Sequence, residues 1–126
     1  MILLLNFCID AFATTEPNIY TENKLGVMVT VDQPQFMIRL ESNPTTGYSW
    51  YLRDYDRQFI TPLKHYYEAP DNKLMGHAGH EVWVFSAKPG AFTVPQMTQI
   101  DLVYIRPWDV TAQSKQVIFR VVSNTR

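Results

Sequence analysis

Cysteine is nearly absent from this sequence, in which Cys8 is the single one among 126 residues. Its isolation excludes a disulfide within the chain and any metal site that needs several thiolates. Neither sign of charge is in excess, because 11 Lys and Arg face 12 Asp and Glu and give a formal net charge of -1. The basic residues are scattered, so the chain lacks the positive stripe that nucleic acid or an anionic membrane attracts. We therefore expect no nucleic-acid or membrane partner for the folded domain.

Long hydrophobic runs are missing too. The longest apolar stretch lies within residues 1–13 and is too short to cross a bilayer. No segment shows a convincing helical period, an internal repeat or low complexity. The length suits one domain, and 46% hydrophobic residues suffice for a single core.

Residues 1–13 combine an apolar run with an Ala-Phe-Ala sequence that ends at Ala13 and matches a signal cleavage pattern. The segment lacks a basic start, which an origin further upstream would explain, and Asp10 interrupts the approach to the cleavage site. An apolar N-terminal strand is the alternative. We interpret the segment as a signal and residues 14–126 as the mature domain, secreted or periplasmic, with a cytoplasmic location as the alternative.

The rest of the chain shows β-branched and alternating apolar patterns, broken by short turn sequences. Pro62 makes its own stretch an edge or bulged strand, and Pro95 is expected to bend another. Trp50 is a candidate core ring on a central strand, and Trp83 is expected to pack rather than to function. The patterns favour an all-β sandwich. The expected strands are residues 27–31, 36–40, 48–53, 59–67, 82–87, 92–105 and 117–122.

Three connections in this plan carry unusual residues. Alternate strand connections of a sandwich emerge at the same end, so residues 43–47, 68–79 and 106–114 should meet at one pole. In the first of them, Pro44 fixes its own φ and Gly47 can take a positive φ. The two threonines between them are small and stiff. Such a short, rigid tip can enter a narrow space at little cost in entropy.

Here the sequence resembles the chagasin-like inhibitors of papain-type cysteine peptidases. The resemblance covers the chain from Leu25 to its C-terminus, and its motifs occur in the family's order. They are Asn43-Pro44-Thr45-Thr46-Gly47-Tyr48-x-Trp50, Lys73-Leu74-Met75-Gly76-x-x-Gly79 and Tyr104-Ile105-Arg106-Pro107-Trp108.

The resemblance implies an immunoglobulin-like fold whose three loops form a wedge that fills the peptidase cleft. Residues 44–47 would lie over the catalytic cysteine and histidine, the glycine loop along one wall, and Arg106 with Trp108 against the other. The protein would be a tight, reversible inhibitor, a monomer that needs no cofactor and is not an enzyme. The implied peptidase-binding residues are Asn43, Pro44, Thr45, Thr46, Gly47, Tyr48, Gly76, His77, Ala78, Gly79, Arg106, Pro107 and Trp108.

The sequence departs from the family pattern at two places. The glycine loop usually reads Gly-x-Gly-Gly, and Ala78 replaces a glycine here. Because alanine resists a positive φ, we expect this loop to differ in shape. Residues 95–99 look like an insertion that could change where Trp108 points.

Other functions remain as alternatives. The same loops would also suit a secreted immunoglobulin-like adhesion or binding module with a partner that is not a peptidase. No motif pairs a Ser, Thr or Cys nucleophile with a base, so we do not expect an enzyme. His65, His77 and His80 are spaced compatibly with a metal, but no acidic or cysteine ligand completes a set, and we expect no metal.

Overall fold

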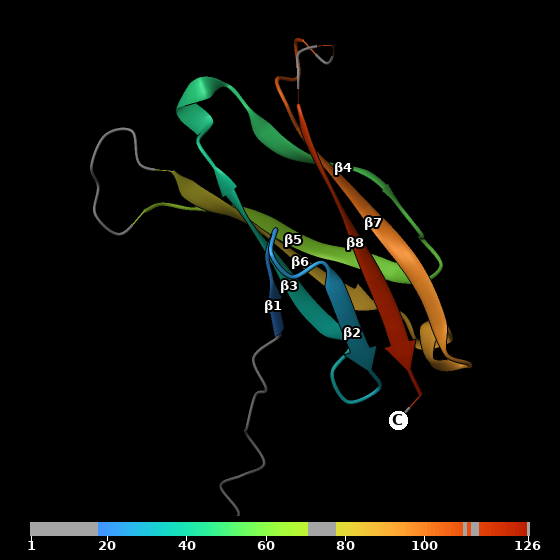
Figure 1. Ribbon diagram of the computed structural model, residues 1–126. Helices are drawn as coiled ribbons and strands as arrows, with labels where there is room; N and C mark the ends of the chain where they lie inside the picture. Colours follow the sequence, from blue (N-terminus) through green and yellow to red (C-terminus); the bar gives the residue numbers. More distant parts are fainter. Residues whose placement is uncertain (1–17, 71–77, 110, 112–113, 126) are drawn as a thin grey trace, which may run out of the picture.

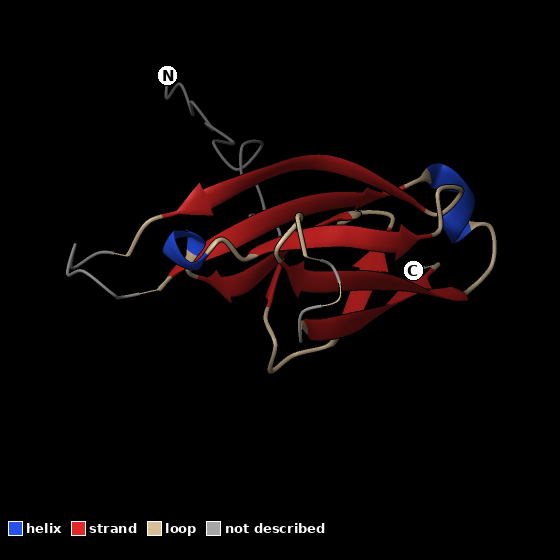
Figure 2. Cartoon of the chain, turned by 90° about the horizontal axis from the view of Figure 1, so that it is seen from above, coloured by secondary structure: helices blue, strands red, loops and turns tan. Residues whose placement is uncertain are grey.

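The computed structural model describes the chain except for residues 1–17, 71–77, 110, 112–113 and 126. Within the described residues, eight strands form two four-stranded sheets, in the orders β1-β3-β6-β5 and β2-β8-β7-β4. Two short 3-10 turns, Pro44–Thr46 and Pro89–Phe92, lie at opposite ends of the strands (Figure 2). The strands are β1 (Asn18–Tyr20), β2 (Gly26–Thr30), β3 (Gln35–Ser42), β4 (Ser49–Tyr55), β5 (Ile60–Glu68), β6 (Gly79–Ala87), β7 (Gln96–Ile105) and β8 (Lys115–Asn124).

The two sheets pack face to face, and the sheet β2-β8-β7-β4 lies in front in Figure 1. Neighbouring strands run antiparallel, except that β1 and β2 pair in parallel with β3 and β8 at one edge of each sheet. The all-β sandwich expected from the sequence is confirmed. No helix in the described part of the chain is long and apolar enough to cross a membrane.

The core fills the space between the sheets. Side chains of a strand alternate between its faces, so every second residue of β3 points inward. Phe36, Ile38 and Leu40 are 0% exposed, as are Ile100 on β7 and Phe119 on β8. Burying a side chain of this size contributes about 1.5–3 kcal/mol relative to leaving it exposed. The apolar alternation of the sequence is therefore what brings the two sheets together.

Three details of the strands differ from the expectations. β1 lies before the first strand expected from the sequence, and its Tyr20 is buried against β3. β7 begins only at Gln96, because the preceding residues form a 3-10 turn and Pro95 cannot donate to a ladder. Trp50 is buried as expected but sits on β4, an edge strand of its sheet and not a central one.

Two other expectations about strands are confirmed. β5 is an edge strand, and its register with β6 shifts between Pro62 and Lys64, as the proline indicated. Trp83 on β6 is half-buried and packs against the core, so it contributes to packing as predicted.

The strand directions place three connections at the same end, which we call the loop pole. Because β3, β4, β5, β6, β7 and β8 follow one another in alternating directions, the connections β3–β4, β5–β6 and β7–β8 leave from one end. In Figure 1 the strand ends from which they leave lie at the top and left, away from the C-terminus. The shared end predicted from the sequence is confirmed by the strand directions, whereas most of residues 68–79 lie outside the described part of the chain.

Replacing Phe119 with alanine tests the core. We expect Phe119→Ala to lower the free energy of unfolding by about 3–5 kcal/mol, because the ring is wholly buried and its loss leaves a cavity. Val94 is 56% exposed, so Val94→Ala should change stability by less than about 0.5 kcal/mol. Urea unfolding followed by circular dichroism measures both; similar values for the two variants would contradict this description of the core.

Candidate functional site

The tip loop, residues 43–48, makes the first contribution to the loop pole. Pro44–Thr46 form a 3-10 turn, and Gly47 ends it with φ 83°, in the left-handed region. Here the sequence prediction of a positive φ at Gly47 is confirmed. The turn leaves Pro44, Thr45 and Thr46 exposed at the tip.

Hydrogen bonds within the tip loop hold its shape. The amide of Gly47 donates to the carbonyl of Pro44 at 3.0 Å, and the amide of Thr46 donates to the carbonyl of Asn43 at 3.2 Å. The hydroxyl of Thr45 donates to the Asn43 side chain, and the hydroxyl of Thr46 to the Asn43 carbonyl, both at 2.7 Å. Both threonine side chains are therefore engaged, so the exposed tip is held by local bonds rather than by burial.

The Trp turn, residues 106–109, lies against the tip loop. Arg106 donates from Nε to the carbonyl of Thr46 at 3.1 Å, and its guanidinium lies 4.5 Å from the ring centre of Tyr48. The amide of Asp109 donates to the Arg106 carbonyl at 3.0 Å, which closes the turn. One arginine thus joins two loops that are 60 residues apart in sequence.

Trp108 extends from this turn over Gly47. Its side chain is 72% exposed, the largest exposed fraction among the big hydrophobic residues of the described chain. A Cβ added at Gly47 would lie 2.6 Å from Cη2 of Trp108. Glycine is thus required at position 47 for two reasons, the positive φ and the closeness of the indole ring. Trp108 therefore presents its other surface to solvent beside the tip.

A column of aromatic rings supports both loops from below. Tyr48 stacks on Tyr104 of β7 with ring centres 5.3 Å apart, and Trp50 of β4 contacts the same tyrosine at 5.0 Å. The hydroxyl of Tyr104 accepts a hydrogen bond from the amide of Asn43 at 3.0 Å. Tyr104 was seen in the sequence only as part of a motif, and its contact with Asn43 depends on the pairing of β4 with β7.

Below the tip loop lies a carboxylate that sequence reasoning missed. Glu81 of β6 is 2% exposed and accepts hydrogen bonds from Ser42, Ser49 and the amide of Trp50. Its Oε1 lies 2.8 Å from Nε2 of His65. The alternation of β6, in which Glu81 shares the inward face with Trp83 and Phe85, was the signal that could have revealed it.

Of the second loop, residues 68–79, the structure describes only the two ends. Gly76 and His77 lie outside the described residues. Ala78 is half-buried, and Gly79 is buried as the first residue of β6, opposite Ser42 of β3. A Cβ at Gly79 would collide with the Glu68 carbonyl oxygen and the Tyr67 hydroxyl group, so this glycine permits close packing between β5 and β6.

Two of the three histidines cannot share a metal ion. Because His80 and Glu81 are neighbours on one strand, their side chains point to opposite faces of the sheet. His65 contacts Glu81 and lies 4.3 Å from the ring of Trp83, so it is on the face away from His80. His77 lies outside the described residues.

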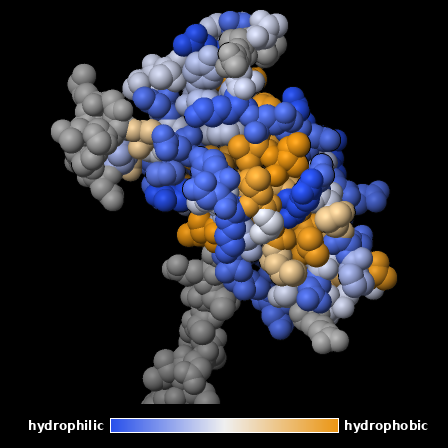
Figure 3. Space-filling model, viewed as in Figure 1, coloured by the Kyte–Doolittle hydropathy of each residue, from blue (hydrophilic) through white to orange (hydrophobic). Residues whose placement is uncertain are grey.

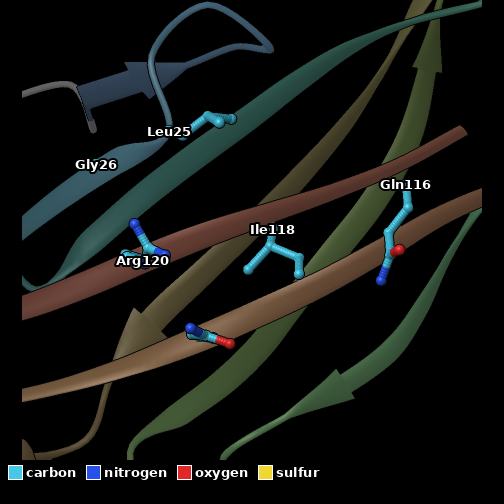
Figure 4. Close-up of a pocket in the computed structure, with 6 residues that line it drawn as sticks. Leu25, Gly26, Gln116, Ile118 and Arg120 are labelled. Atoms are coloured by element: carbon cyan, nitrogen blue, oxygen red, sulfur yellow. The ribbon is translucent and has the colours of Figure 1, made fainter.

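The loop pole is a projecting surface. Its exposed residues are mainly polar, proline or tryptophan, and Figure 3 draws the top of the molecule mostly in blue and pale colours. Apolar side chains gather lower, over the sheet that faces the viewer. A hollow of about 420 Å³ on that sheet is lined by Leu25, Gly26, Gln99, Gln116, Ile118 and Arg120 (Figure 4). None of the predicted site residues lines it.

A methyl group at position 47 tests the fit between the two loops. We expect Gly47→Ala to lower the free energy of unfolding by about 1–2 kcal/mol, because alanine is strained at φ 83°. It should also move the indole N–H signal of Trp108 in a nitrogen–proton correlation spectrum. Gly90 has nothing within 4 Å of an added Cβ, so Gly90→Ala is the matched control and should do neither. An unmoved Trp108 signal in Gly47→Ala would contradict the contact.

Comparison with known proteins identifies a family for this chain. The family model described as Chagasin family peptidase inhibitor I42 matches residues 30–122. Chagasin of Trypanosoma cruzi is 32% identical over 88 residues, which cover 66% of this chain and 76% of that protein. The matched region contains the tip loop and the Trp turn.

Solved structures show the same fold. The cysteine protease inhibitor EhICP2 from Entamoeba histolytica has a TM-score of 0.69 at 20% identity, covering 85% of this chain and 95% of that one. Amebosin has a TM-score of 0.64 at 24% identity, covering 86% and 100%. PbICP-C, solved in complex with falcipain-2, has a TM-score of 0.61 at 18% identity, covering 86% and 92%. With the sandwich, its loop pole and the family match together, the chain belongs to the chagasin family of peptidase inhibitors.

Proposed function

We propose that this protein inhibits papain-like cysteine peptidases by placing its loop pole in the active-site cleft. The observation that carries the proposal is the joining of the tip loop to the Trp turn through Arg106, which makes one projecting surface from two loops. The family match and the complex of PbICP-C with falcipain-2 support a cysteine peptidase as the partner.

The tip suits occlusion without reaction. Its apex, residues 44–46, is exposed and small, so it can approach catalytic groups closely. The Thr45 and Thr46 hydroxyls are already bonded within the loop, so little conformational freedom is lost on binding. Inhibition by steric exclusion needs no bond to be made or broken, which fits a reversible inhibitor.

The flanking residues supply the interface energy in this proposal. Tryptophan, tyrosine and arginine are the residues that most often dominate binding energy in interfaces. Trp108 is exposed beside the tip, whereas Arg106 and Tyr48 are half-buried against each other and hold the surface in place. We assign Trp108 and Pro107 to one wall of the cleft. The second loop, through residues 76–78, would meet the other wall.

The other predictions extend this proposal. Export, inferred from residues 1–13, would place the inhibitor where it meets secreted or periplasmic peptidases. A monomer is sufficient for the mechanism, because the tip loop and the Trp turn come from one chain.

A titration tests the function directly. The purified protein is added to active papain and to a cathepsin L-like enzyme, and hydrolysis of a fluorogenic peptide is followed. We expect saturable inhibition that is reversed by dilution, with the inhibitor recovered intact. A folded sample that inhibits no papain-like enzyme in a wider panel would overturn the proposal and would favour the binding-module alternative.

Charge at the tip tests the mechanism. Thr45→Glu and Trp108→Glu should each weaken inhibition at least about a hundredfold, because a carboxylate would be desolvated in the cleft without a partner. Val94→Glu adds the same charge to an exposed residue at the opposite pole and should leave the inhibition constant unchanged. Inhibition constants and melting temperatures are measured together; full potency in both tip variants would refute occlusion by this pole.

A further inference from the structure

The Glu81 carboxylate lies beneath the loop pole and does not contact a peptidase in the proposed mechanism. A buried carboxylate costs free energy unless several donors replace the water that it has lost. Here the donors are protein groups, and the side chain is 3% exposed. An apolar side chain of the same size would avoid this cost, so the arrangement needs another explanation than core packing.

The donors stand at both ends of the tip loop. Ser42, the residue just before the loop, donates to Oε2 of Glu81 at 2.5 Å. Trp50 lies just beyond the loop's other end, and its amide donates to the same oxygen at 3.0 Å. Ser49 donates to Oε1 at 3.2 Å. A single carboxylate therefore binds the chain immediately before and immediately after the loop.

No strand ladder could make this connection. The tip loop crosses from β3 in one sheet to β4 in the other, so its two ends are not paired with each other. β4 is an edge strand, and the amide of Trp50 donates to a carboxylate of the opposite sheet. Glu81 comes from β6, which is paired to β3, and so bridges the gap between the sheets.

We propose that Glu81 is a positioning residue, a clamp that fixes the separation of the two ends of the tip loop and so holds the tip ready to bind. This inference rests on the proposed inhibition. His65, whose side chain is 39% exposed, closes the solvent side of the clamp through its 2.8 Å contact with Oε1. A loop that is already held in its binding conformation loses little conformational entropy on binding, so it binds more tightly than a loose loop with the same contacts.

Two buried serines give a matched test. Ser42 and Ser123 are each 1% exposed and each makes a hydrogen bond in the interior. Ser42 donates to the clamp, whereas Ser123 accepts the amide of Gln96 at 2.9 Å near the opposite pole. Ser42→Ala and Ser123→Ala remove the same hydroxyl group from similar surroundings. Ser42→Ala should cost more stability, because its hydrogen bond is to a carboxylate, and it alone should weaken inhibition.

The expected result is selective. Ser42→Ala should raise the inhibition constant for papain about tenfold, as loss of a hydrogen bond to a charged group warrants. It should also speed hydrogen exchange of the amides of residues 45–50 in the free protein. Ser123→Ala should do neither, and the melting temperatures of both variants show that each is folded under the conditions of the assay. Equal losses of inhibition and equal exchange rates in the two variants would overturn the clamp.

Substitution of Glu81 separates hydrogen bonding from bulk. Glu81→Gln keeps one acceptor oxygen for the Trp50 amide and should retain inhibition within about threefold, whereas Glu81→Leu loses every acceptor and should lose at least about tenfold. If the wild-type protein inhibits and every clamp variant has the same inhibition constant, the clamp fails and the proposed function stands. If the wild-type protein does not inhibit, the proposed function fails. The clamp is then judged by hydrogen exchange only: faster exchange of the amides of residues 45–50 in Ser42→Ala supports it, and unchanged exchange overturns it.

Discussion

Hydrogen bonds to the buried carboxylate of Glu81 connect the two sheets at the end from which the tip loop and the Trp turn leave. Apolar contacts join the sheets along most of their length, but such contacts are not directional. At the loop pole, the bonds from Ser42 and the Trp50 amide fix where one strand ends and the next begins. The tip loop, the column of aromatic rings and the Trp turn are built outward from this point.

The exposed part of the pole is rigid without a core of its own. In the tip loop, short side chains bond to the backbone of the same loop, which is how turns are stabilised locally. The Trp turn adds an arginine that binds a backbone carbonyl and a tyrosine ring at once. The surface is therefore ordered by polar and aromatic contacts, and it leaves Trp108 largely exposed.

Glycine acts in two different ways at this pole. Gly47 has a positive φ and supports the indole ring, so both its conformation and its size matter. Gly79 is needed only for close packing, since a side chain there would collide with β5. The sequence predicted the first role from the turn pattern. The second depends on the pairing of β5 with β6, and no local pattern could have shown it.

The strand patterns of the sequence were sufficient for much of the fold. Alternation predicted most strands and the shared pole, and Pro62 indicated a bulged edge, because side-chain direction and proline geometry are local properties. Local properties did not predict the features that depend on which strands pair. β1 is three residues long and is held by its pairing with β3, and Trp50 lies on an edge strand because of the order of the sheet.

The sequence by itself determined the loop residues, the family resemblance and the positive φ at Gly47, since each depends on neighbouring residues in the chain. Only the tertiary structure decided that Arg106 reaches Thr46, that Trp108 covers Gly47 and that Glu81 bridges Ser42 and Trp50. The residues in these contacts are 31 to 61 positions apart in the sequence, and the contact of Glu81 with Trp50 joins the two sheets. Their geometry comes from strand order and sheet packing, which no window of local sequence contains.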